Sequence, residues 1–463
     1  MPASASRDPG ALASPARPYR THASSVAFAG LAQPRLMRSP CGLANARLLG
    51  YMMLSIDIRA GPRRPCVFEA GLWGNPRDEE EGSMSASTTV GAATPGEPTQ
   101  PDAATPPPAR RGVDDFGRTI DYLRIAITDR CNFRCVYCMP TSGVHLMRHE
   151  RMLSYEEIVR FVRIATEFGI KHLRLTGGEP LARKGCVELA AMLSALPGIE
   201  DIAITTNGSL LPKLARPLVE AGVSRVNISL DTLDAETFHA VTRVGHLEDA
   251  LAGIDAALEA GFKTVKINCV AVRSLKQDVL GMAKLSLDRP LHVRFIEYMP
   301  IGSDDMNLLT QGETEAIGGH DRERAHVSVA DWSAQDTIPS DELRQMISDL
   351  GEADGAGPLL PASQDRPTGY GPADYWKFAG AQGTVGFISA MSNHFCKTCN
   401  RLRLTADGCI RPCLFSDAEV SVHDALRAGD DDAVRAAFRE ALRIKPDAHH
   451  TEGTERYMSQ IGG

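Results

Sequence analysis

The chain has 463 residues, of which 43% are apolar, so it can bury a large core and has room for two or three domains. Its formal net charge of −8 argues against general nucleic-acid binding, and it lacks the run of about 18 apolar residues that predicts a membrane span. Six of its 11 cysteines fall into two short clusters, which favours metal sites in a reducing compartment over a disulfide framework.

Residues 1–113 are rich in Ala, Pro, Ser and Gly and show no sustained periodicity, so they predict a disordered extension. Residues 1–54 contain one acidic residue, Asp8, against several arginines, which is typical of an organellar transit peptide. The alternative is that translation starts at Met84. The expected location is the cytoplasm, or the mitochondrion if the extension is a transit peptide.

From about Asp114 short apolar strands alternate with amphipathic helices. The first helix has clear ends, because Ser154 and Glu157 match a capping box and Gly169 matches a C-cap. Six strand–helix units predict an α/β fold with a parallel sheet, an incomplete (β/α)6 TIM-like barrel over residues 114–335. The predicted strands are 122–128, 172–176, 201–206, 225–230, 263–270 and 292–298, and the later helices are 185–195, 210–221, 246–260 and 277–287.

The pattern changes after Met299. Residues 303–336 are mostly polar and predict an insertion that decorates the surface or edges the opening of the barrel. Residues 336–463 predict a smaller α+β domain. Its expected elements are a helix at 340–350, a loop at 354–372, strands at 375–378 and 383–388, and helices at 421–428 and 431–444.

Three cysteines follow the first predicted strand with the spacing Cys131-x3-Cys135-x2-Cys138. Three thiolates this close can hold three corners of an iron–sulfur cube and leave one iron open, since ordinary cubes use four cysteines. The loop after a barrel strand is also where barrel enzymes keep their chemistry. The alternative is a structural zinc knuckle, although zinc sites usually pair two C-x2-C units.

A second cluster has the spacing Cys396-x2-Cys399-x13-Cys413, and Cys409 is a rival third ligand. Spacing alone does not separate an iron–sulfur site from a four-cysteine zinc site that uses Cys409 as well as Cys413. Arg401 and Arg403 lie between these ligands on an extended segment, so their side chains point to one side and can bind phosphate oxygens.

Two further features predict bound ligands at the barrel opening. The second strand ends in Leu175-Thr-Gly-Gly-Glu-Pro180, where two glycines allow a ligand to approach the backbone and Glu179 can accept from an ammonium group. Arg124 and Lys266 alternate with apolar residues on predicted strands, so they point away from the apolar side. An acidic protein needs such local cations to bind a polyanion.

Taken in order, these motifs closely resemble the GTP 3′,8-cyclases of molybdenum cofactor biosynthesis, which are radical S-adenosylmethionine (SAM) enzymes. The resemblance runs from about Phe116 to Gly463, outside the extension. The second cysteine cluster and the Gly-Gly end separate this family from other radical SAM enzymes. The matching segments are Arg124, 128–140, 174–180, 205–208, 227–231, 266–268, 294–299, 396–403 with Cys413, and the terminal Gly-Gly.

The resemblance implies a role for each matching residue. A first [4Fe–4S] cluster would be held by Cys131, Cys135 and Cys138, and SAM would be lined by Tyr137, Gly178, Ser229 and Met299. A second [4Fe–4S] cluster, whose open iron meets guanine, would be held by Cys396, Cys399 and Cys413. The residues facing GTP would be Arg124, Arg174, Thr205, Lys266, Arg401 and Arg403. Candidates for catalytic roles are Arg401, Arg403 and the tail glycines Gly462 and Gly463, which would reach into the active site.

The implied reaction converts GTP to (8S)-3′,8-cyclo-7,8-dihydroguanosine 5′-triphosphate. A 5′-deoxyadenosyl radical from SAM abstracts the ribose 3′-hydrogen, and the resulting C3′ radical attacks guanine C8. The implied partners are a low-potential electron donor of the flavodoxin or ferredoxin type and a downstream cyclic pyranopterin monophosphate synthase. No nucleic-acid or membrane partner is expected, and a homodimer is possible. The alternatives are a peptide-modifying radical SAM enzyme and a non-enzymatic zinc or iron–sulfur scaffold.

Overall fold

The computed structural model describes residues 112–139, 144–299, 301, 332, 334–449, 454 and 456–462. These residues belong to one compact unit, Thr99–Gly463. Almost all of the predicted extension, most of the predicted insertion at 303–336, and Gly463 lie outside the described residues.

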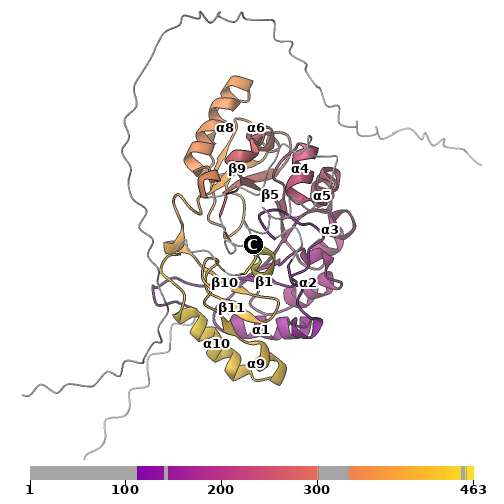
Figure 1. Ribbon diagram of the computed structural model, residues 1–463, viewed down its shortest axis with the longest axis vertical. Helices are drawn as coiled ribbons and strands as arrows, with labels where there is room; N and C mark the ends of the chain where they lie inside the picture. Colours follow the sequence, from indigo (N-terminus) through magenta and orange to yellow (C-terminus); the bar gives the residue numbers. More distant parts are fainter. Residues whose placement is uncertain are drawn as a thin grey trace, which may run out of the picture. The chain divides into compact units, whose positions relative to one another are not determined.

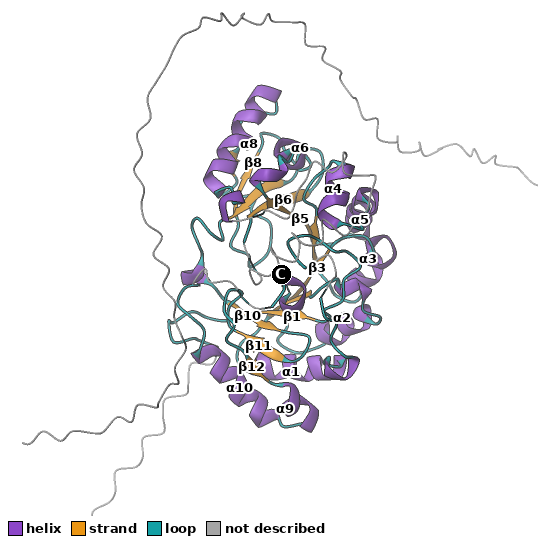
Figure 2. Ribbon diagram, in the orientation of Figure 1, coloured by secondary structure: helices purple, strands orange, loops and turns teal. Residues whose placement is uncertain are grey.

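The described strands form one open sheet of twelve strands, in the order β12-β11-β10-β1-β2-β3-β4-β5-β6-β9-β8-β7 (Figure 2). Six consecutive parallel strands make its centre, which confirms the predicted α/β barrel-like fold. Their bounds agree with the predicted strands to within two residues. They are β1 (Tyr122–Ala126), β2 (His172–Thr176), β3 (Asp201–Thr206), β4 (Arg225–Ser229), β5 (Thr264–Ala271) and β6 (Leu291–Glu297).

Helices follow the central strands and lie on the outer side of the sheet (Figure 1). They are α1 (Tyr155–Glu167), α2 (Cys186–Ser194), α3 (Leu211–Glu220), α4 (Ala235–Thr242), α5 (Leu247–Ala260) and α6 (Val279–Lys284). The pattern did not predict α4, and it predicted a longer α6. Among the described residues, no helix is both long enough and apolar enough to cross a membrane.

The ends of α1 show how the local sequence sets an element. The Ser154 side chain accepts from the Glu157 amide, and the Glu157 side chain accepts from the Ser154 amide, so the predicted capping box is present. At the other end Gly169 follows the C-cap residue Phe168 with φ +92°, a conformation that favours glycine. The apolar side of α1, including Phe161, is fully buried in the core.

The C-terminal region continues the same sheet at both edges. On one side β10 (Arg401–Leu404) pairs parallel with β1 and is followed by β11 (Cys409–Arg411) and β12 (Val420–Ser421). On the other side β9 (Thr384–Ile388) pairs parallel with β6 and is followed by β8 (Asp374–Lys377) and β7 (Leu360–Pro361). In the part of the C-terminal region that the structure describes, the α-helices are α8 (Ser340–Asp354), α9 (His423–Ala428), α10 (Asp431–Arg443) and α11 (Met458–Ile461).

This pairing has a direct consequence for the site. Cys396 and Cys399 of the second cysteine cluster precede β10 and Cys413 follows β11, whereas the first cluster lies on the loop after β1. Because β10 and β1 are parallel neighbours, the start of β10 lies beside the start of β1, and segments almost 280 residues apart in the chain meet there. A hydrogen bond of 2.6 Å from Asn400 Nδ2 to Asp121 Oδ1 joins the starts of the two strands.

Candidate active site

The central sheet has one apolar and one polar face, because side chains alternate along each strand. Leu123, Leu173 and Ile204 point outward into the helix-covered core and are fully buried. Their neighbours in sequence point inward and surround a cavity. Its lining includes Tyr122, Arg124, Arg174, Thr176, Thr205, Ser229, Asn268, Arg294, Arg401 and Arg403. The predicted fold thus produces a cavity on the inner face of the sheet, into which several charged side chains point.

The loop after β1 carries Cys131, Cys135 and Cys138, and all three line this cavity. A turn shapes the loop, since Cys138 N donates to Cys135 O at 2.9 Å. Two bonds attach the loop to the end of α4: Arg134 N donates to Thr242 O and Val136 N to Val241 O, both at 3.0 Å. Helix α4, which the sequence pattern missed, therefore supports the first cysteine loop.

The glycine motif after β2 packs against the base of this loop. Gly178 N donates to Thr128 O, and Glu179 N donates to Arg130 O, both at 2.8 Å. A Cβ on Gly178 would lie 2.3 Å from Arg130 O, and one on Gly177, at φ +129°, would lie 2.2 Å from Thr128 O. The sequence suggested that the glycines admit a ligand. In the structure they admit the neighbouring backbone, and both also line the cavity.

Glu179 is buried and is held by three donors: Thr206 Oγ1 and Asn207 N at 2.8 Å, and Leu181 N at 3.0 Å. Burial raises the pKa of its carboxyl to about 7, against the effect of these hydrogen bonds. A buried carboxylate that lines a cavity favours a cationic ligand group, such as an ammonium.

The four residues predicted to surround SAM, which are Tyr137, Gly178, Ser229 and Met299, all line the same cavity. The structure adds Asp231, to which the sequence assigned no role. Tyr137 Oη donates to Asp231 Oδ2 at 2.7 Å, and Val270 N donates to Asp231 Oδ1 at 2.8 Å. Burial raises the pKa of Asp231 to about 6. The sequence signals for this residue were its place at the end of the fourth strand and inside the matching segment 227–231.

Three arginines align across neighbouring strands. In the sheet register Arg403 of β10, Arg124 of β1 and Arg174 of β2 lie side by side, and all line the cavity. Arg174 Nε also donates to Tyr122 Oη at 2.5 Å. Burial and the charges of Arg403 and Arg174 lower the pKa of Arg124 well below its usual range. Cations crowded in this way favour a polyanionic ligand that relieves their repulsion.

Thr205 and Arg401, predicted with these arginines, also line the cavity, but Lys266 does not. Its Nζ donates to Thr368 O at 2.7 Å, so a segment of the predicted 354–372 loop covers it. Burial, followed by the charge of Arg294, lowers the pKa of Lys266 to about 6. Lys266 thus faces inward as predicted, with its ammonium bonded to the loop.

Arg294 is a cation of the cavity to which the sequence assigned no role. It is buried, and its guanidinium donates to Asn227 Oδ1 at 2.8 Å and to Asn268 Oδ1. Burial lowers its pKa to about 10. Its inward direction follows from its alternation with Val293 and Phe295, which are buried in the core.

The second cysteine cluster lies beside the cavity, where its neighbours Phe395 and Leu414 contribute to the lining. Burial raises the pKa of Cys396, and the charges of Cys413 and Cys399 raise it further, whereas the pKa of Cys409 is raised by burial and by Asp407 and Glu419. Arg456 Nη2 also lies 3.9 Å from Cys409 Sγ. These surroundings favour Cys413 over Cys409 as the third predicted ligand, a choice that spacing left open.

A buried cation supports this cluster. Lys445 Nζ donates to Arg401 O at 2.9 Å and to Pro412 O at 2.7 Å, and it lies 3.6 Å from Cys399 Sγ. His449 N donates to Cys396 Sγ at 3.4 Å. One short segment, 445–449, therefore provides polar hydrogens to two of the three sulfurs. Nothing in the local sequence pattern indicated this role.

The described residues contain one group of three possible ligand atoms within 4.8 Å of one another: His394, Cys396 and His449. Neither complete cysteine triplet is that compact. The histidines provide an alternative set for a single ion at the second triplet.

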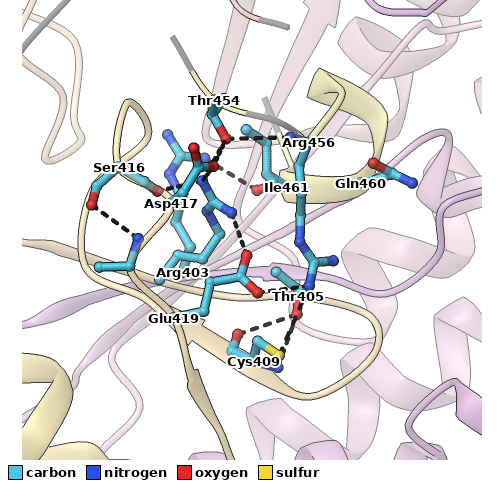
Figure 3. Close-up of polar contacts among 12 residues, drawn as sticks. Arg403, Thr405, Cys409, Ser416, Asp417, Glu419, Thr454, Arg456, Gln460 and Ile461 are labelled. Atoms are coloured by element: carbon cyan, nitrogen blue, oxygen red, sulfur yellow. Dashed lines mark hydrogen bonds and ion pairs between the residues drawn. The ribbon is translucent and has the colours of Figure 1, made fainter. Parts of the chain in front are cut away.

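The C-terminal segment closes the site. Met458 and Ser459 of α11 line the cavity. Arg403 Nη1 donates to the carbonyl of Gly462 and, at 3.4 Å, to that of Ile461 (Figure 3). Gly462 has φ +70°, and a Cβ there would lie 2.9 Å from Thr176 Oγ1. Gly462 lies against Arg403 and Thr176 but is not among the residues that line the cavity. The catalytic role predicted for the tail glycines therefore stays a prediction, and Gly463 lies outside the described residues.

A three-cysteine loop at the end of the first barrel strand, above a polar cavity, is the arrangement of radical SAM enzymes. The family model described as Radical SAM superfamily matches residues 125–285, and the one described as Molybdenum Cofactor Synthesis C matches residues 323–451.

Full-length relatives narrow the class to one family. The chain is 48% identical over 355 residues to a GTP 3′,8-cyclase of Pelotomaculum thermopropionicum, covering 76% of this chain and 99% of the relative. It is 45% identical to the enzyme of that name from Petrotoga mobilis and 46% identical to that from Heliobacterium modesticaldum, covering 76% of this chain and 100% of each relative. The chain belongs to the GTP 3′,8-cyclase family of molybdenum cofactor biosynthesis.

Proposed function

We propose that this chain converts GTP to (8S)-3′,8-cyclo-7,8-dihydroguanosine 5′-triphosphate with SAM and two [4Fe–4S] clusters. The observation that carries the proposal is the row Arg403–Arg124–Arg174, which lies in one cavity with the first cysteine loop and beside the second. Phosphate oxygens accept bidentate hydrogen bonds from guanidinium groups, so a triphosphate matches the row in charge and in geometry.

The first cysteine loop suits a cluster with one open iron. Cys131, Cys135 and Cys138 supply three soft ligands that line the cavity. When bound, this cluster and SAM would supply a 5′-deoxyadenosyl radical that starts the chemistry at the ribose of GTP. Glu179 and Asp231 flank the loop, and we assign the methionine ammonium of SAM to the neighbourhood of Glu179. Tyr137, Gly178, Ser229 and Met299 would enclose the rest of SAM.

The second cysteine triplet also suits a cube. Cys396, Cys399 and Cys413 are partly buried, and Lys445 and the His449 amide lie where they would donate to cluster sulfurs. Arg401 extends from this loop toward the cavity, with its guanidinium carbon 4.9 Å from the centre of the Phe395 ring. We assign the guanine end of GTP to this side of the cavity.

The remaining cations complete the nucleotide site in this proposal. Arg294 and the predicted residues Thr205 and Arg401 line the cavity around the arginine row. Lys266 would join them if the Thr368 carbonyl released its ammonium. The chain's own contribution is to bind and orient both substrates and to exclude water, because a radical intermediate must not meet stray hydrogen donors.

Two partners belong to the proposal. An electron donor of the flavodoxin or ferredoxin type would reduce the first cluster, and a cyclic pyranopterin monophosphate synthase would consume the product. The possible homodimer remains a prediction.

The test is mass spectrometry of an anaerobic reaction. The full chain is reconstituted with iron and sulfide and given SAM, dithionite and GTP that carries deuterium at C3′. The proposal predicts 5′-deoxyadenosine that contains deuterium, together with an isomer of GTP. Cys131→Ala should abolish both products. Cys186→Ala is the matched control, because Cys186 is buried in α2 outside both cysteine loops.

Other outcomes would separate the alternatives. 5′-Deoxyadenosine without any change in GTP would keep the radical SAM class and refute GTP as the substrate. Zinc in place of iron, with neither product formed, would support the scaffold interpretation and contradict the proposed activity.

A further inference from the structure

The last described segment of the chain is held by an ion-pair cluster outside the cysteine loops (Figure 3). Arg456 lies between two carboxylates: its Nη2 is 3.0 Å from Asp407 Oδ2 and 2.7 Å from Glu419 Oε2. Asp407 lies in the turn between β10 and β11, and Glu419 immediately precedes β12. We call these three residues the tail clamp. It joins the C-terminal segment to the edge of the sheet that carries the arginine row.

A second set of contacts, around the buried side chain of Arg411, also holds the C-terminal segment. Arg411 has a side chain only 1% exposed, contacts Glu419, and donates to Thr454 Oγ1 at 2.8 Å. The Thr454 hydroxyl donates in turn to Asp417. Two tail residues, Thr454 and Arg456, are therefore fixed by four charged side chains. Several of these groups are buried, so each contact that is satisfied within the network favours the observed position of the tail.

The tail clamp determines what the next residues reach. Helix α11 begins two residues after Arg456, and its first two residues, Met458 and Ser459, line the cavity. Gln460 Oε1 accepts from Tyr457 N at 3.1 Å and fixes the start of this helix. The segment ends with the Gly462 carbonyl on Arg403. Anchored at both ends, α11 forms one wall of the site.

Ser459 has an unusual environment within this wall. The residue is 3% exposed, and its Oγ has no hydrogen-bond partner among the described residues. A buried hydroxyl without a partner is unfavourable, and such groups are rare unless a ligand or water completes them. Because Ser459 also lines the cavity, its missing partner is expected to be the ligand that fills the cavity.

We propose that the tail clamp positions α11 so that the Ser459 hydroxyl forms a hydrogen bond with the bound substrate. The inference rests on the proposed function for the identity of that substrate, GTP. A nucleoside triphosphate offers both donors and acceptors to a hydroxyl, which can accept as well as donate. Arg456 is then a positioning residue that acts through the tail, and Ser459 is a binding residue of the site.

The binding test uses the full chain with both clusters and omits SAM and reductant, so no turnover occurs. GTP affinity is measured by anaerobic equilibrium dialysis for wild type and Ser459→Ala. Loss of one hydrogen bond should weaken GTP binding by about 2- to 12-fold. Ser421→Ala, an exposed serine of β12, is the matched control and should bind as wild type. Equal affinity of Ser459→Ala and wild type would refute the contact.

The positioning test uses Arg456→Met. Its matched control is Arg443→Met, because the Arg443 side chain is 64% exposed and, within the described part of the chain, forms an ion pair with nearby Glu440 alone. Arg456→Met should speed amide hydrogen exchange in residues 456–462 and weaken GTP binding at least as much as Ser459→Ala. Ser459→Ala should leave exchange unchanged, and Arg456→Lys should restore part of the protection.

Unchanged exchange in Arg456→Met would refute the tail clamp, whatever happens to GTP. Failure of wild type to bind GTP would instead count against the proposed function, since the exchange comparison does not need the nucleotide. The two failures are therefore distinguishable.

Discussion

Arg118 provides a sharp test of how the second cysteine loop is held. Its guanidinium makes four hydrogen bonds: Nε to Asp114 Oδ2 at 2.6 Å, Nη1 to Cys396 O at 2.9 Å and Asp447 O at 3.0 Å, and Nη2 to Pro446 O at 2.6 Å. The Arg118 side chain is 7% exposed and that of Asp114 is fully buried. One buried cation thus connects the start of the barrel, the second cysteine loop and the segment that carries Lys445.

Arg118→Met should be strongly destabilising. The substitution leaves the Asp114 carboxylate buried with only the amides of Phe116 and Arg118 as donors. Breaking a buried ion pair from one side costs about 3–5 kcal/mol, a large part of the roughly 5–15 kcal/mol that stabilises a typical domain. The Cys396 carbonyl also loses its donor, so iron bound per chain should fall toward half as the second cluster is lost.

The measurements are urea denaturation followed by circular dichroism, and iron content after reconstitution. Arg443→Met is the control, since exposed local pairs contribute about 0.3–0.5 kcal/mol. Asp114→Asn combined with Arg118→Met should recover part of the loss, because the buried charge is then removed. An unfolding free energy of Arg118→Met within 1 kcal/mol of wild type, with full iron, would refute the reasoning.

Three further predictions follow from the site. Gly178→Ala should weaken SAM binding about tenfold or more and lower the iron content of the first cluster, because the new Cβ would lie 2.3 Å from the Arg130 carbonyl oxygen. Isothermal titration with SAM would test this, and an unchanged affinity would contradict it. The folded-state pKa of Glu179 is raised from 4.5 to about 7, so the folded protein holds this proton more tightly than the unfolded chain and its stability should fall as pH rises from about 4.5 to 7. Urea denaturation at several pH values gives the free energy of unfolding across this range. That free energy should fall less steeply with pH in Glu179→Gln than in wild type, and equal slopes for the two proteins would contradict the raised pKa. Lys445→Met should lower the reduction potential of the second cluster, because it removes a cation 3.6 Å from Cys399 Sγ, whereas Lys445→Arg should preserve the potential. A redox titration monitored by electron paramagnetic resonance would measure it, and equal potentials for Lys445→Met and wild type would exclude the effect.

The central fold was predictable because it depends on local periodicity. The six parallel strands read as alternating or apolar runs, and α1 carries its own capping box. Helix α4 was missed: it is only eight residues long, although Asp234 caps it by accepting from Thr237 N at 2.8 Å. Short helices with few buried positions leave a weak periodic signal.

The site was predictable only where residues adjacent in sequence carry it. The cysteine triplets and the glycine motif are local, so their spacing was informative. The covering of Lys266 by Thr368 and the contact of Lys445 with Cys399 join residues more than 40 positions apart. The tail clamp is equally non-local. Periodicity contains no information about such long-range contacts. Spacing could not distinguish Cys413 from Cys409, because their surroundings also depend on residues distant in the sequence.

The pairing of β10 with β1 also has a consequence for biosynthesis. The bond from Asn400 to Asp121, at the start of this pairing, spans 279 residues. At about 5–20 residues per second, the edge of β1 remains unpaired for roughly 14–56 s while the rest of the chain emerges from the ribosome. The second cysteine loop and the α11 wall form only after that interval. A nascent chain therefore carries an open sheet edge and only half of the cysteines proposed to hold the two clusters, so the sheet edge is exposed to aggregation until the last part of translation.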